Sequence, residues 1–69
     1  MNTLTINGET KAFPDGLPGT VAELLDQLNI DQATVVAEID EQIVKRTEFG
    51  TTSLVSGQRI ELIRFVGGG

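Results

Sequence analysis

A single amphipathic helix, predicted between two groups of β-strands, constrains the fold of this chain more than any other feature of the sequence. Thr20 is a favourable N-cap residue, and Glu23 follows it at the spacing of a capping box. Apolar residues then recur at helical spacing along one stripe, at Val21, Leu24, Leu25 and Leu28. Asn29 is expected to end the helix. Because this one stripe must be covered, we expect the helix to lie across one face of a sheet.

Short strands are predicted on both sides of the helix. Their expected positions are residues 3–7, 9–13, 35–39, 42–44 and 59–66. Asn7-Gly8 is a strong signal for a tight hairpin between the first two strands. Residues 45–52 are expected to be irregular with one helical turn, and Leu54 and Val55 to make a short apolar contact.

The order of these elements predicts an α+β domain of the β-grasp, ubiquitin-like type. The first and last strands are expected to pair in parallel at the centre of a mixed sheet of four to five strands, with one helix packed on one face. We expect residues 1–66 to form this single domain. Residues 67–69 are expected to be a flexible glycine tail.

The composition argues against an enzyme. The chain of 69 residues contains neither cysteine nor histidine, so it has no thiol nucleophile, no imidazole base and no thiolate or imidazole metal ligand. The acidic residues at 38, 40, 41 and 48 do not follow the spacing of a calcium-binding loop, so we expect no metal site. Stability therefore has to come from one compact apolar core.

The charge balance also limits the partners. The formal net charge of −5 disfavours binding to nucleic acid or to an anionic membrane surface. The first residues lack the basic and apolar regions of a signal peptide, and no apolar run approaches the length of a membrane span. We expect a cytoplasmic protein that is monomeric when free.

The phase of the last strand predicts an exposed apolar patch. If Ile60 and Leu62 face the helix, Ile63 and Phe65 face outward, and Val36 shares their face. The alternative is that residues 45–52 partly bury Ile63 and Phe65. The residues expected to contact a partner are Val36, Ile63, Arg64, Phe65, Val66, Gly67 and Gly68.

The sequence ends in Gly67-Gly68-Gly69, directly after the final predicted strand. Glycine has no Cβ, so this segment is thin enough to enter a narrow cleft of another protein and to present the Gly69 carboxylate there. The alternative is an ordinary frayed end.

Two stretches resemble the ubiquitin-like sulfur carriers of thiamine (thiazole) biosynthesis, the ThiS family. They are residues 39–49 (IDEQIVKRTEF) and residues 57–69 (GQRIELIRFVGGG), and the resemblance extends over essentially the whole chain. The chain departs from the family pattern at Asp40, where Asn is common, at Lys45, where Pro is common, and at Gln58, where Asp is common. All three are predicted turn positions.

The resemblance implies a protein co-substrate and not a catalyst. An adenylyltransferase of the ubiquitin-activating type would use ATP and magnesium to adenylate the carboxylate of Gly69, and the carrier itself would bind no cofactor. A persulfide sulfur donor would then convert this terminus into a thiocarboxylate, from which thiazole synthase takes the sulfur. Three alternatives stay open: a sulfur carrier for molybdopterin or another thiolated product, a ubiquitin-like protein modifier, and a plain binding module whose tail is inert.

Overall fold

The structure, a computed structural model, describes residues 2–64. It contains a five-stranded sheet, one α-helix and two short 3-10 helices. In chain order the elements are β1 (Thr3–Ile6), β2 (Glu9–Ala12), α1 (Val21–Gln27), η1 (Gln32–Thr34), β3 (Val35–Ile39), β4 (Gln42–Val44), η2 (Arg46–Glu48) and β5 (Arg59–Arg64). The predicted order of strands and helix is confirmed.

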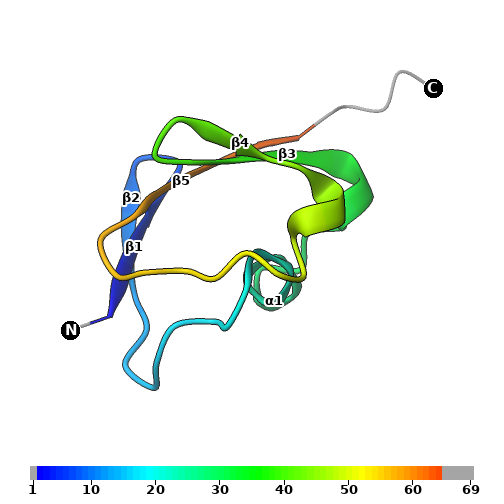
Figure 1. The fold of residues 1–69 in the computed structure, drawn as a ribbon. Helices are drawn as coiled ribbons and strands as arrows, with labels where there is room; N and C mark the ends of the chain where they lie inside the picture. Colours follow the sequence, from blue (N-terminus) through cyan, green and yellow to red (C-terminus); the bar gives the residue numbers. More distant parts are fainter. Residues whose placement is uncertain (1, 65–69) are drawn as a thin grey trace.

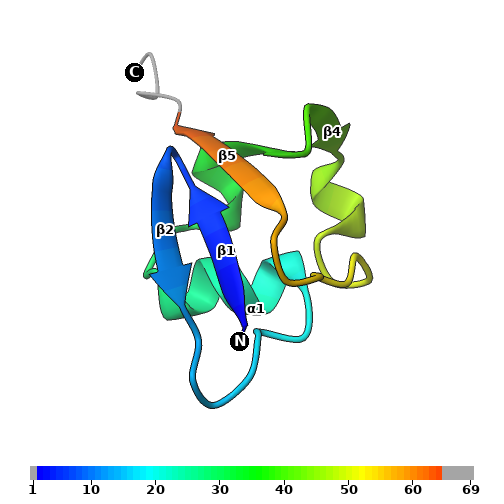
Figure 2. The same cartoon turned by 90° about the vertical axis from the view of Figure 1, so that its left-hand side faces the viewer.

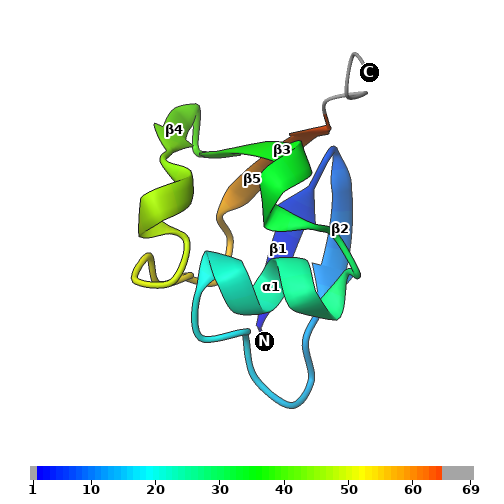
Figure 3. The same ribbon diagram turned by 90° about the vertical axis from the view of Figure 1, so that its right-hand side faces the viewer.

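The sheet has the mixed topology that the sequence predicts. Its strand order is β2-β1-β5-β3-β4, and β1 and β5 pair in parallel with Ile6 opposite Ile60, whereas the other neighbours are antiparallel. Helix α1 crosses one face of this sheet, as the end-on view of Figure 1 and the front view of Figure 3 show. This is the β-grasp architecture.

Helix α1 begins and ends where its caps predict. The Thr20 hydroxyl oxygen accepts a hydrogen bond from the backbone N–H of Glu23 at 3.2 Å. Asn29 has a φ of 58°, and its N–H donates to the Asp26 carbonyl at 3.1 Å. The next N–H, of Ile30, donates to the Leu25 carbonyl at 2.9 Å, which completes a Schellman motif.

The core lies between α1 and the sheet. The largest fully buried side chains are those of Phe49, Leu4, Leu24, Leu25, Ile60 and Val21. Phe49 directly follows η2, so the irregular segment also contributes to the core. The expected apolar contact of Leu54 and Val55 is only half right, because Leu54 is buried but Val55 is 61% exposed. The Val55 N–H donates to Gln58 Oε1 at 2.8 Å in a surface turn.

Two of the residues that depart from the family pattern, Asp40 and Lys45, fit the backbone at their positions. Asp40 and Glu41 have φ values of 48° and 71°, as a two-residue hairpin between β3 and β4 requires. Asp40 Oδ1 also accepts a hydrogen bond from the Arg59 N–H at 3.0 Å. Lys45 has a φ of −68°, the value that proline would fix.

Candidate partner-binding surface

The face of the sheet opposite α1 carries an apolar pair at its centre. Val36 on β3 lies opposite Ile63 on β5. Ile63 is 50% exposed and Val36 is half-buried, whereas Ile60 and Leu62, in the other phase of β5, are buried. The predicted phase of the last strand is thus confirmed for Ile63. The alternative was that residues 45–52 partly bury Ile63 and Phe65. Ile63 keeps half of its surface exposed, and Phe65 lies outside the described residues.

The same face contains an apolar residue that sequence reasoning missed. Ile43 on β4 is 68% exposed and lies opposite Glu38 of β3, one diagonal step from Val36. Val44, the next residue of β4, is half-buried, and the alternation of the strand turns Ile43 outward. A strand of three residues is too short for this alternation to be predicted from the sequence. We call Val36, Ile43 and Ile63 together the outer-face patch.

Two carboxylates lie within this face. Glu38 and Glu61 are directly opposite each other on β3 and β5. Like charges in such a cross-strand pair are destabilising, and a cation on a partner would relieve the repulsion. The exposed Arg59 lies on the same face of β5, and the exposed Arg64 ends the strand. The outer-face patch is therefore bordered by charges of both signs.

The end of β5 is held by a side chain from the first hairpin. Asn7 Oδ1 accepts a hydrogen bond from the Leu62 N–H at 2.8 Å, and Asn7 Nδ2 donates to the Leu62 carbonyl at 3.3 Å. Asn7 is also a turn residue, with a φ of 50°. The hairpin turn lies beside the end of β5 in Figure 2. The sequence predicted the turn but not this contact, which depends on the tertiary pairing of β1 with β5.

The remaining predicted site residues follow β5 in the sequence. Phe65, Val66, Gly67, Gly68 and Gly69 lie outside the described residues. Of the predicted partner-binding residues, the structure thus brings Val36 and Ile63 together on one face and places Arg64 at the end of β5.

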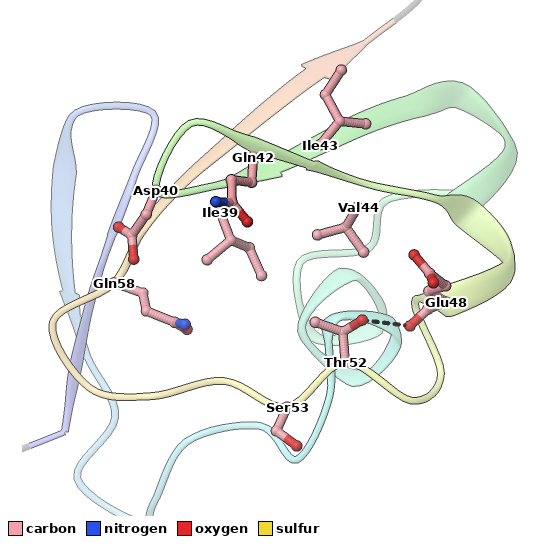
Figure 4. A pocket seen from close by; sticks show the side chains of 9 residues that line it. All are labelled: Ile39, Asp40, Gln42, Ile43, Val44, Glu48, Thr52, Ser53 and Gln58. Atoms are coloured by element: carbon pink, nitrogen blue, oxygen red, sulfur yellow. Dashed lines mark hydrogen bonds between the residues drawn. The ribbon is translucent and has the colours of Figure 1, made fainter.

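A groove of about 360 Å³ lies between β4 and the loop that precedes β5. Figure 4 shows the residues that line it: Ile39, Asp40, Gln42, Ile43, Val44, Glu48, Thr52, Ser53 and Gln58. Thr52 Oγ1 donates to the backbone carbonyl of Glu48 at 2.7 Å, so this hydroxyl is engaged in holding the loop. The groove contains no pairing of a nucleophile with a base.

The described part of the chain also offers no metal centre. Residues 2–64 contain no group of three or more acidic, histidine or cysteine side chains that could hold a metal ion. No helix within the same residues is long and apolar enough to cross a membrane.

Comparison with known proteins agrees with this description. Residues 4–69 match the model of the ThiS family. The crystal structure of a thiamine biosynthesis protein (ThiS) from Geobacter metallireducens is 35% identical, with a TM-score of 0.79, and the match covers 97% of this chain and 99% of that chain. The solution structure of a thiamine biosynthesis protein from the same organism gives 35% identity and a TM-score of 0.76, over 97% of this chain and 87% of that chain.

A curated relative is much longer. A protein of Paramagnetospirillum magneticum named thiazole synthase is 33% identical over 66 residues, which are 96% of this chain and 20% of that protein. The chain thus spans about a fifth of the length of this relative. With a family match over nearly all its residues and the same fold as a solved member, the chain belongs to the ThiS family of ubiquitin-like sulfur carriers.

Proposed function

We propose that this protein carries sulfur for thiazole formation in thiamine biosynthesis, with the carboxylate of Gly69 as the site that is loaded. The observation that carries the proposal is the family match, which runs through the last glycine of the sequence. Support also comes from the β-grasp fold, which the chain shares with a thiamine biosynthesis protein over 99% of that protein's length.

The proposed chemistry takes place on the Gly69 terminus. A carboxylate oxygen attacks the α-phosphorus of ATP on a ubiquitin-activating-type adenylyltransferase, pyrophosphate leaves, and an acyl adenylate forms. The terminal sulfur of a persulfide then attacks the acyl carbon and AMP leaves. A thiol cleaves the resulting S–S bond, which releases the thiocarboxylate. ATP, magnesium and the sulfur come from partners, so this chain has only to present its terminus.

The role of the chain is therefore recognition and presentation. Gly67 and Gly68 would let the backbone pass close to the nucleotide, because they have no side chain. Val36 and Ile63 of the outer-face patch would dock on the adenylyltransferase, with Arg64, Phe65 and Val66 continuing the contact towards the terminus. Exposed apolar surface of this kind is typical of protein-binding sites.

Thiazole synthase is the proposed acceptor of the sulfur. A protein with this name contains a segment of 66 residues that is 33% identical to this chain. A carrier-like segment within such a protein favours a functional link between the two activities. Molybdopterin or another thiolated product is the alternative destination.

Intact-protein mass spectrometry tests the proposal. The protein is incubated with ATP, magnesium, the cognate adenylyltransferase and a persulfide donor, and a variant that lacks Gly69 serves as the control. We expect a mass gain equal to the replacement of one oxygen by sulfur, which is reversed when thiazole synthase and its substrates are added. Covalent adducts on lysines without a thiocarboxylate would instead support a protein modifier. A thiocarboxylate that thiazole synthase leaves untouched would support another sulfur acceptor.

A further inference from the structure

The geometry points to Asn7 as a positioning residue that holds the end of β5 and so sets the direction in which the tail leaves the domain. This inference rests on the proposed function, since it concerns how Gly69 reaches the adenylyltransferase. The relevant contact is the pair of hydrogen bonds between the Asn7 side-chain amide and the backbone of Leu62, at 2.8 Å and 3.3 Å.

The amide continues the sheet at a point where the first strand has ended. The parallel pairing of β1 with β5 uses the Thr5 N–H, which donates to the Gln58 carbonyl at 3.0 Å, and the Asn7 N–H, which donates to the Ile60 carbonyl at 2.9 Å. The chain then turns away at Asn7 and Gly8. The next backbone groups of β5 on that side belong to Leu62, and the Asn7 amide supplies one acceptor and one donor for them.

With the Asn7 contact, the end of β5 has hydrogen-bonded partners along both of its edges. On its other edge β5 is paired with β3 as far as Arg64, which lies opposite Val35. On the β1 side, the Asn7 amide is the last partner of β5 within residues 2–64. Without it, the half-buried N–H and carbonyl of Leu62 would lose their partners, and the last residues of the strand would detach from β3 more often.

The position of Leu62 links this contact to the tail. Gly69 is seven positions after Leu62, a span of at most about 25 Å if extended. A firmly held strand end restricts the directions from which the terminus can approach a partner. If the strand end is loose, it has to be ordered when the carrier binds, and this entropic cost weakens binding to the adenylyltransferase.

Asn7→Gly isolates the contact from the turn. Glycine adopts the positive φ of this position readily, and Gly-Gly is a favourable hairpin turn, so the variant removes the amide and keeps the backbone. Asn29→Gly is the matched control, because Asn29 also has a positive φ, of 58°, but its side chain makes no hydrogen bond among residues 2–64. Asn7→Asp is the conservative variant, since it keeps an acceptor for the Leu62 N–H.

Two measurements on the full chain are needed. Amide hydrogen exchange by NMR reports on the Leu62 N–H without any partner, and we expect it to be about tenfold faster in Asn7→Gly. ATP–pyrophosphate exchange by the cognate adenylyltransferase reports on presentation of Gly69. There we expect KM for the carrier to rise about three- to tenfold while kcat is unchanged, with partial recovery in Asn7→Asp and no change in Asn29→Gly.

Each other outcome overturns the inference. Unchanged exchange at Leu62 would show that the amide does not hold the strand end. Faster exchange with a wild-type KM would show that the held end has no effect on presentation. An equal rise of KM in Asn29→Gly would show a general effect of backbone freedom. If the unmodified protein is not adenylated at all, the proposed function itself fails. Amide hydrogen exchange at Leu62 needs no enzyme, so it still shows whether the Asn7 amide holds the end of β5.

Discussion

Val36 on β3 and Ile63 on β5 are cross-strand neighbours on the face of the sheet opposite α1. Truncation of Ile63 should therefore affect binding more than folding. For Ile63→Ala we expect binding to the adenylyltransferase to weaken by about 2 kcal/mol, the scale of an interface hot spot. The free energy of unfolding should fall by less than about 1 kcal/mol, because the side chain is half exposed. Calorimetric titration and denaturant unfolding measure the two effects.

Val55→Ala provides the matched control for this test. Val55 is 61% exposed but belongs to the turn before β5 and not to the outer-face patch. The Val55→Ala variant should bind the adenylyltransferase with wild-type affinity. Equal losses of affinity for Val55→Ala and Ile63→Ala would show that the adenylyltransferase does not use the outer-face patch selectively.

The helix stripe gives a prediction about stability. Leu24 is completely buried between α1 and the sheet, so Leu24→Ala should destabilise the fold by about 2–5 kcal/mol. Gln27→Ala, at an exposed position of the same helix, should change stability by less than about 0.5 kcal/mol. Urea unfolding of both variants measures the difference. A shift below about 1 kcal/mol for Leu24→Ala would mean that the core does not depend on this stripe.

Local signals in the sequence were sufficient to predict the fold. The Thr20 cap, the Asn7-Gly8 turn and the alternation of Ile60 and Leu62 each act over a few residues, and each has the predicted structure. Their order leaves few ways to cover one helix with one sheet, which is why the parallel pairing of β1 and β5 could also be predicted.

The contacts that were missed depend on tertiary structure. The Asn7 amide meets Leu62, 55 positions later in the chain, only because β1 ends beside β5. The exposure of Ile43 was missed because β4 is an edge strand of three residues, which is too short for a reliable alternation pattern. Val55 was expected to be packed because it is apolar, but the hydrogen bond from its N–H to Gln58 keeps it in a surface turn. Sequence periodicity carries no information on such contacts.

The backbone at Lys45 predicts a stabilising substitution. Lys45 has a φ of −68°, and its N–H donates no hydrogen bond within residues 2–64. Proline fits both conditions, so Lys45→Pro should raise the free energy of unfolding by about 0.4–1 kcal/mol by restricting the unfolded chain. Glu48→Pro is the contrasting variant, because the Glu48 N–H donates to the Lys45 carbonyl at 2.8 Å, and it should destabilise. A lower melting temperature for Lys45→Pro would contradict this reading of the turn.

The glycine tail leads to the most direct prediction about the proposed chemistry. In Gly68→Val, a β-branched side chain would restrict the backbone and add bulk next to the terminus that has to approach the nucleotide. We expect the rate of adenylation to fall on the order of 100-fold, as a displacement of about 1 Å at a reacting group can produce. Gly68→Ala, which adds only a methyl group, should have an intermediate rate. ATP–pyrophosphate exchange measures all three proteins, and thermal unfolding checks that each remains folded. Wild-type rates for folded Gly68→Val would mean that the terminus is not bound in a narrow channel, and the role proposed for the glycines would then be wrong.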